Sequence, residues 1–217
     1  AEFSTLRADC VEWRIDCFEG AKDLPAIVHC AAKLRVALKD QLLLFTFRTK
    51  AEGGKVALAL EEYLHFIRVV LATDCADLID IEFFTAGAEL PALIEEAHTA
   101  GAAVVCSSHD FHKTPPRTEL VSRMMQMQRA GADLPKLAVM PQSRTDVLEL
   151  LAATAEMADL HPETPIITMS MGALGAVSRL SGEALGSAMT FANPGQASAP
   201  GQVSLEVVNE VLDALHL

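Results

Sequence analysis

One lysine lies inside an apolar segment of this 217-residue chain, in the run Leu-Pro-Lys-Leu-Ala-Val-Met at 134–140. Lysine is rarely buried without a functional reason, and an apolar surrounding disfavours its charged form. A neutral amine can attack a carbonyl carbon and form an imine. Lys136 is therefore a candidate Schiff-base residue. The alternative is a lysine whose stem lies along an apolar wall while its ammonium group reaches water.

Three charged residues alternate in a second segment, as Glu12, Arg14 and Asp16 in Glu-Trp-Arg-Ile-Asp. Alternate residues of a strand point to the same face. Three charges on one face of an apolar strand are costly unless they are paired or solvated in a cavity. The segment therefore indicates either a polar cavity or a structural layer of ion pairs.

Two histidines follow a third apolar segment, in Ser-Ser-His-Asp-Phe-His-Lys at 107–113. A histidine here suits general acid/base catalysis, although a hydrogen-bonded core histidine would also fit position 109. His109 and His112 are three residues apart, but at the end of a strand this spacing points them apart. With no third ligand evident, we expect no metal site. Further polar residues at or after the ends of apolar segments are Arg48, Glu52, Asp80, Glu82, Arg179, Ser198 and Gln202.

The elements that must position these residues are short apolar segments alternating with longer segments of helical period. Most of the short segments are apolar at successive positions, which is typical of parallel strands covered on both faces. The predicted strands are residues 10–16, 42–48, 77–83, 102–109, 134–140, 165–171 and 188–192. The predicted helices are residues 23–39, 55–73, 88–100, 116–130, 144–160, 173–185 and 204–215.

The strands begin about every 30 residues, which is the size of one βα unit. Seven such units without a long linker favour an α/β fold of the (β/α)8 TIM-barrel type, in one domain over residues 1–217, rather than a doubly wound sheet. Because such a barrel has eight strands and residues 2–8 resemble the end of a helix, we expect its first strand and most of a helix to be missing from this chain. In a parallel barrel the carboxyl ends of the strands build the active site.

Composition excludes several classes of protein. The formal net charge of −12 and the lack of a Lys/Arg cluster argue against a nucleic-acid-binding face. No apolar run of about 18 residues is present, so we expect no transmembrane helix, and no signal peptide is visible. Five cysteines without a Cys-x-x-Cys pair favour reduced, mostly buried thiols in a cytosolic protein over a disulfide framework or a zinc ribbon.

Several motifs together resemble type I 3-dehydroquinate dehydratase. They include Glu-Trp-Arg-Ile-Asp at 12–16, Phe-Thr-Phe-Arg at 45–48, His-Asp-Phe-His-Lys-Thr-Pro at 109–115 and Pro-Lys-Leu-Ala-Val-Met-Pro at 135–141. Ile-Thr-Met-Ser-Met at 167–171 and Ser-Ala-Pro-Gly-Gln at 198–202 also fit the family. The motifs occur in the family's order and span essentially the whole chain.

The resemblance implies a (β/α)8-barrel lyase of the shikimate pathway, which leads to the aromatic amino acids. It implies a cytoplasmic homodimer that converts 3-dehydroquinate to 3-dehydroshikimate without metal or cofactor and binds neither nucleic acid nor membrane. Lys136 matches the family's Schiff-base lysine, His109 its general acid/base, and Glu52 the carboxylate that accompanies the histidine. The substrate's polar shell is matched by Glu12, Arg14, Arg48, Arg179, Ser198 and Gln202, and its apolar wall by Met169, Met171 and Phe191.

Alternatives remain open at this point. Arg179 could be a solvated helix residue, or it could bind a phosphorylated sugar in an aldolase-type lyase. Family members carry a strand and most of a helix before the Glu-Trp-Arg motif. Their absence here leaves a trimmed chain, a fragment completed by other material, or a degenerate barrel that binds the ligand without turnover.

Overall fold

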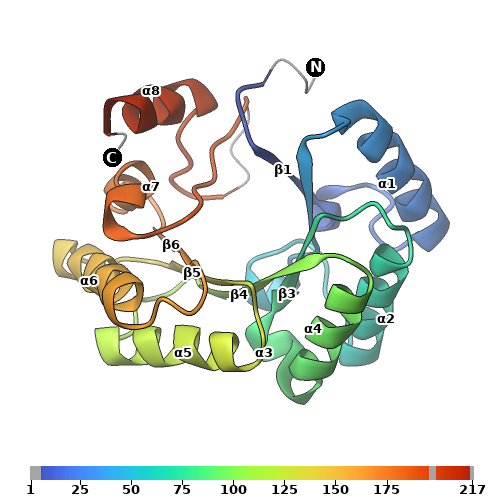
Figure 1. The fold of residues 1–217 in the computed structure, drawn as a ribbon, viewed down its shortest axis with the longest axis horizontal. Helices are drawn as coiled ribbons and strands as arrows, with labels where there is room; N and C mark the ends of the chain where they lie inside the picture. The colour runs from blue at the N-terminus through green and yellow to red at the C-terminus, as the bar shows by residue number, and fades with distance from the viewer. Residues whose placement is uncertain (1–5, 196–198, 216–217) are drawn as a thin grey trace. The chain divides into compact units, whose positions relative to one another are not determined.

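The computed structural model describes residues 6–195 and 199–215. The chain folds as two compact units, and the division falls within one strand, β4 (Ala103–Asp110). The first unit comprises Ala1–Cys106 with Ala130–Ala132, and the second comprises Ser107–Arg129 with Asp133–Leu217. In both units strands alternate with helices along the chain (Figure 1), so the α/β class expected from the sequence is confirmed.

Three parallel strands form the centre of the first unit: β1 (Cys10–Arg14), β2 (Leu42–Thr46) and β3 (Leu78–Glu82). They are hydrogen-bonded in chain order, and the first half of β4 follows β3. Every residue of β3 is buried, as are the last four of β2. Burial on both faces explains why β2 reads as a continuous apolar run rather than as an alternating one.

The helices of the first unit are α1 (Leu24–Leu38), α2 (Leu60–Leu71), α3 (Phe83–Ala86) and α4 (Leu90–Thr99). Short 3-10 turns follow β1, β2 and α3: η2 (Ile15–Cys17), η3 (Lys50–Glu52) and η4 (Gly87–Glu89). The start of α1 is capped by the Asp23 side chain, which accepts the backbone N–H of Ala26 at 3.1 Å. Helix α4 ends before Gly101, whose φ of +81° is the left-handed conformation predicted for a glycine after a helix.

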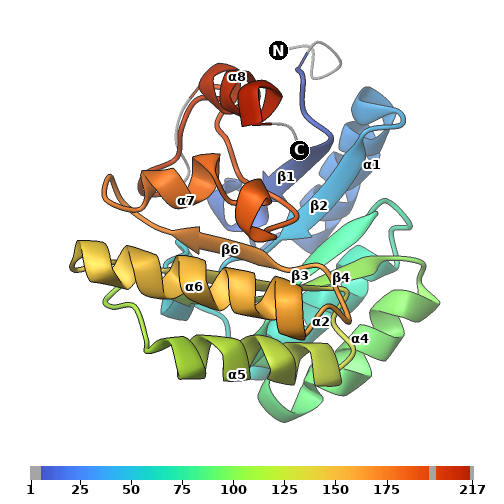
Figure 2. The same cartoon turned by 60° about the vertical axis from the view of Figure 1, so that its left-hand side comes forward.

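In the second unit, β5 (Leu134–Val139) and β6 (Ile167–Ser170) are parallel neighbours, with Lys136 opposite Ile167. The helices are α5 (Arg117–Arg129), α6 (Arg144–Leu160), α7 (Ala176–Leu180) and α8 (Leu205–Leu215), with the 3-10 turn η5 (Glu183–Leu185) after α7. Helices α5 and α6 lie side by side (Figures 1 and 2). Met124 and Met127 of α5 are buried, as expected for residues that fill a core.

The prediction of a seventh strand at 188–192 is wrong. This segment forms no strand, and next to it a single parallel bridge joins Ile166 to Ser187. The Ser187 hydroxyl accepts the backbone N–H of Thr168 at 3.1 Å. Because a side chain occupies the amide that would extend the pairing, the ladder stops after one rung.

Other predicted boundaries also shift. Strand β1 ends at Arg14, and Asp16 lies in η2 rather than on the strand. The helix predicted at 55–73 begins only at Leu60, and the one predicted at 173–185 is divided into α7 and η5. Residues 6–8 are not helical, so the predicted helix end is wrong there, and residues 2–5 of that prediction lie outside the described part of the chain.

All five cysteines are unpaired, but only Cys106 is buried and Cys17 is exposed, so the expectation of mostly buried thiols is wrong. Burial is the main cause that raises the pKa of the Cys106 thiol. Among the described residues, no helix combines the length and apolar character needed to cross a membrane.

The first testable prediction concerns the apolar core of the first unit. Phe47 is 1% exposed, and its ring centroid lies 4.7 Å from that of Phe66. We expect Phe47→Ala to lower the free energy of unfolding by about 3–5 kcal/mol, since it leaves a cavity. Phe84, which is 61% exposed, provides the control, and Phe84→Ala should cost less than about 1 kcal/mol. Urea unfolding at pH 7 measures both, and equal losses would contradict the assignment of Phe47 to the core.

Candidate functional site

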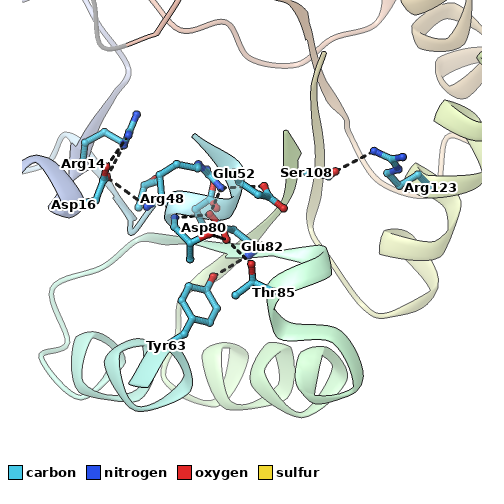
Figure 3. Close-up of polar contacts among 12 residues, drawn as sticks. Arg14, Asp16, Arg48, Glu52, Tyr63, Asp80, Glu82, Thr85, Ser108 and Arg123 are labelled. Atoms are coloured by element: carbon cyan, nitrogen blue, oxygen red, sulfur yellow. Dashed lines mark hydrogen bonds and ion pairs between the residues drawn. The ribbon is translucent and has the colours of Figure 1, made fainter. Parts of the chain in front are cut away.

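An ion pair closes the turn after β1. The guanidinium of Arg14 donates two hydrogen bonds to the carboxylate of Asp16, Nε to Oδ1 at 2.7 Å and Nη2 to Oδ2 at 2.9 Å (Figure 3). The same carboxylate accepts the backbone N–H groups of Lys55 at 3.2 Å and Arg48 at 3.4 Å. Asp16 therefore joins β1 to both ends of the loop that follows β2.

These donors explain the acidity of Asp16. Burial alone would raise the pKa of its carboxyl, but the hydrogen bonds and charge of Arg14, together with the two backbone N–H groups, outweigh burial and lower that pKa. Asp16 thus remains ionised at neutral pH although it is 2% exposed.

A second guanidinium, that of Arg48, is buried between the carboxyl ends of β2 and β3. Its Nη2 lies 2.7 Å from Asp80 Oδ2, and its Nη1 lies 2.9 Å from Glu82 Oε1 and 3.6 Å from Glu52 Oε2. Figure 3 shows the three carboxylates gathered around Arg48. Burial acts to lower the pKa of Arg48, but the three negative charges prevail and raise it.

A tight loop brings Glu52 to Arg48. Glu52 ends the 3-10 turn η3, and Gly53 follows with a φ of +87°. Gly54 passes so close to the backbone that a Cβ there would lie 1.8 Å from the Arg48 carbonyl oxygen. The Gly-Gly pair therefore allows the chain to fold back and keep the Glu52 side chain beside the guanidinium.

In the second unit, Lys136 lies in the middle of β5 and is 3% exposed. Its Nζ lies 4.1 Å from the centroid of the Phe191 ring, a distance at which an amine or ammonium packs against an aromatic face. The head group of Lys136 is therefore inside the protein, and the alternative in which it reaches water does not hold.

Arg179 of α7 is also buried, at 2% exposure. It donates long hydrogen bonds to the Phe191 carbonyl at 3.5 Å and the Pro200 carbonyl at 3.3 Å, and its Nη1 lies 3.5 Å from the sulfur of Met169. Within the described residues no carboxylate pairs with Arg179, and its Nε has no hydrogen-bond partner. Burial lowers the pKa of this uncompensated guanidinium. Such a group is suited to bind an anion.

The remaining predicted residues range from half-buried to buried. His109 is half-buried at the end of β4, and its ring is stacked 6.4 Å from that of Phe111. The Asp110 carboxylate accepts the backbone N–H groups of His112 and Lys113 and so shapes the turn beyond His109. Glu12, half-buried on β1, accepts the hydroxyl of Thr46 at 2.8 Å. Of the others, Met169 and Met171 are buried, Gln202 and Phe191 are half-buried, and Ser198 lies outside the described residues.

The structure thus groups the predicted residues by unit. The first unit holds Glu12, Arg14, Arg48 and Glu52 and brings Arg48 and Glu52 together. The second brings Lys136 to Phe191, and Arg179 to Met169 and Phe191, and it also holds His109, Met171 and Gln202.

Part of the cluster around Arg48 was not predicted from the sequence. Asp80 and Glu82 were recognised as polar residues but were not assigned to the site, and Thr49, Tyr63 and Thr85 were not selected. The alternation in Leu-Ile-Asp-Ile-Glu at 78–82 is a signal for the two acids, but no local pattern marks the other three. In the described part of the chain, no group of three or more His, Cys, Asp or Glu side chains is arranged to hold a metal ion.

The second prediction concerns the Arg14–Asp16 ion pair. Because its folded-state pKa is lowered, Asp16 stabilises the fold fully above the unfolded pKa of about 3.9, and this contribution is lost as the pH falls through the lower folded-state value. Breaking a largely buried pair should cost about 3 kcal/mol at pH 7. We expect Asp16→Asn to show this loss at pH 7 and a shrinking one below about pH 4.

Urea unfolding at a series of pH values measures that difference. Asp40→Asn is the control, because Asp40 is exposed and its replacement should change the free energy of unfolding by less than about 0.5 kcal/mol at pH 7. A gap for Asp16→Asn that stays constant down to about pH 3 would contradict the lowered pKa.

Comparison with known proteins agrees with the family resemblance of the sequence motifs. The model of the family described as type I 3-dehydroquinase matches residues 1–217. The chain is 49% identical to a 3-dehydroquinate dehydratase of Klebsiella pneumoniae over 96% of this chain and 83% of that protein. It is 48% identical to one of Bacillus subtilis over 97% of this chain and 83% of that protein.

A solved structure resembles the whole described fold. The type I 3-dehydroquinate dehydratase of Clostridium difficile, solved with covalently modified comenic acid, superposes with a TM-score of 0.95 at 43% identity, covering 99% of this chain and 85% of that one. Since the family model, the relatives and the fold agree over nearly the entire length, the chain belongs to the type I 3-dehydroquinase family.

Proposed function

We propose that this protein is a lyase that dehydrates 3-dehydroquinate to 3-dehydroshikimate through a Schiff base on Lys136. The observation that carries this proposal is a lysine 3% exposed in the middle of a strand, with its Nζ 4.1 Å from the centroid of an aromatic ring. Membership of a family whose relatives are named 3-dehydroquinate dehydratase supports the choice of substrate and the place in the shikimate pathway.

The chemistry requires an electron sink. Elimination of water next to a ketone begins with removal of a proton from a weakly acidic carbon. An imine between Lys136 and the ketone, once protonated, accepts the resulting electron pair as an enamine, with loss of one water when the imine forms. Hydrolysis of the product imine returns the amine, so the cycle needs neither metal nor cofactor.

His109 is the proposed general acid/base. An imidazole titrates near neutral pH, so it can take the carbon-bound proton and return one to the departing hydroxyl. It is half-buried at the end of β4. Glu52 is proposed as the carboxylate that accompanies the histidine, held by Arg48 at 3.6 Å.

Arg179 is proposed to bind the substrate's carboxylate. The chain carries a net charge of −12, which repels an anion, so attraction must come from a local cation. Arg179 is buried and, within the described part of the chain, has no carboxylate partner. The hydroxyls are assigned to the polar shell of Glu12, Arg14, Arg48, Ser198 and Gln202, and the apolar wall to Met169, Met171 and Phe191.

We further propose that residues 1–217 act as a single barrel domain in a cytoplasmic homodimer. The resemblance to the family carries this part of the proposal. Analytical ultracentrifugation of the native protein tests the homodimer, and a monomer at enzyme-assay concentration would contradict this part of the proposal.

The third prediction tests the imine. Borohydride reduction in the presence of 3-dehydroquinate should leave a covalent adduct on Lys136, found by peptide mass analysis. Lys136→Met should abolish the adduct and lower kcat by about 10⁴-fold or more. The control is Lys33→Met, a change of an exposed lysine in α1, which should leave both unchanged. An adduct on another lysine, or none in a folded sample, refutes the proposal. Binding without turnover in the wild type would instead indicate an incomplete site.

The fourth prediction separates binding from stability at Arg179. We expect Arg179→Met to raise KM by about 100-fold, since it removes a charge-assisted pair with the substrate. The same change should leave the free energy of unfolding equal or higher, because it removes a buried charge that no carboxylate pairs with among the described residues. Steady-state kinetics and urea unfolding measure the two effects, with Arg144→Met at the exposed start of α6 as control. A large loss of stability with unchanged KM would make Arg179 a structural residue.

A further inference from the structure

The carboxylate of Glu82 is fully buried and accepts four hydrogen bonds. Its Oε1 accepts from Arg48 Nη1 at 2.9 Å and from the backbone N–H of Thr49 at 2.8 Å. Its Oε2 accepts the hydroxyls of Thr49 at 2.7 Å and Thr85 at 2.6 Å. At 0% exposure, Glu82 has no access to a ligand, so its role is exercised through the groups it holds.

Two of these four bonds come from Thr49, the residue directly before η3. Since η3 ends at Glu52, Glu82 holds the start of the turn that carries Glu52. A third bond fixes Arg48, whose other contacts include Glu52 at 3.6 Å. Glu82 thus acts on Glu52 by two routes, through the backbone of the turn and through the guanidinium.

Glu82 is itself anchored from α2. Its backbone N–H donates to the hydroxyl of Tyr63 at 2.9 Å, and Tyr63 is 0% exposed (Figure 3). The far side of the loop is closed as well, since the Gly54 N–H donates to the Thr49 carbonyl at 2.8 Å. Thr49 therefore binds Glu82 before η3 and Gly54 after it, and Glu82 is itself held by Tyr63. The orientation of η3 thus depends on the position of the Glu82 carboxylate.

We propose that Glu82 is a positioning residue, which sets the places of Glu52 and Arg48 for catalysis without touching the substrate. The inference rests on the function proposed above, because it assigns Glu52 and Arg48 to the reacting site. It adds Glu82 and Thr49 as the pair of residues that orders η3, the turn that carries Glu52.

Two threonines provide a matched test, since each donates one hydroxyl to the same Oε2 atom of Glu82. Only Thr49 adjoins η3, whereas Thr85 lies in α3. We expect Glu82→Gln to lower kcat at least tenfold and Thr49→Val at least threefold, and Thr85→Val to stay within twofold of the wild type. Thr49→Ser, which retains the hydroxyl, should restore kcat to within twofold. Each valine variant removes one hydroxyl hydrogen bond from the buried Oε2 of Glu82, and both should lower Tm.

Hydrogen exchange of the peptide covering residues 48–56 gives a readout independent of turnover. Glu82→Gln and Thr49→Val should accelerate its exchange, and Thr85→Val should not. Equal kcat losses in the two valine variants, an unchanged kcat in Glu82→Gln, or unchanged exchange would overturn the proposal. An inactive wild type would refute the proposed function and the catalytic part of this inference, and the exchange data would still decide whether Glu82 orders the turn.

Discussion

The buried ion cluster around Arg48 is the constraint on which the first unit depends. One guanidinium faces carboxylates from β3 and η3 at 2.7–3.6 Å. Removing any member would leave a charge in a setting where water cannot replace the lost partner. The cluster therefore fixes where β2 ends, where β3 ends and how the loop between β2 and α2 returns. A site built on these strand ends inherits that rigidity.

The two buried arginines illustrate opposite uses of one side chain. Arg48 has more negative neighbours than it can neutralise, and its pKa is raised. Arg179 has carbonyl groups and a sulfur atom as its protein partners, and its pKa is lowered by burial. The first arrangement stabilises the protein itself. The second leaves a buried positive charge without a carboxylate among the described residues, which is the basis for the proposed role of Arg179 in binding an anion.

Prediction from sequence succeeded where one short segment carries the information. The apolar runs located β2 to β6 because parallel strands are buried on both faces, and Lys136 stood out against its apolar neighbours in β5. It failed where a distant side chain decides. Ser187 takes the Thr168 amide that would extend pairing at 188–192, and Asp16, predicted on a strand, instead accepts the backbone N–H groups of Arg48 and Lys55. Tyr63, Thr49 and Thr85 form hydrogen bonds with Glu82 from three separate segments of the chain. No spacing in the sequence predicts that these residues contact one another.

The loop after β2 shows how stability and function become linked. Asp16 holds the backbone N–H groups of Arg48 and Lys55, and Glu82 holds that of Thr49. Both carboxylates are buried and accept donors from the loop, and these same hydrogen bonds hold the loop in its shape. A change that loosens the loop would therefore remove hydrogen-bond donors from both acids, and a change in either acid would release the loop. The place of Glu52 therefore depends on Asp16 and Glu82, two buried residues outside the loop itself.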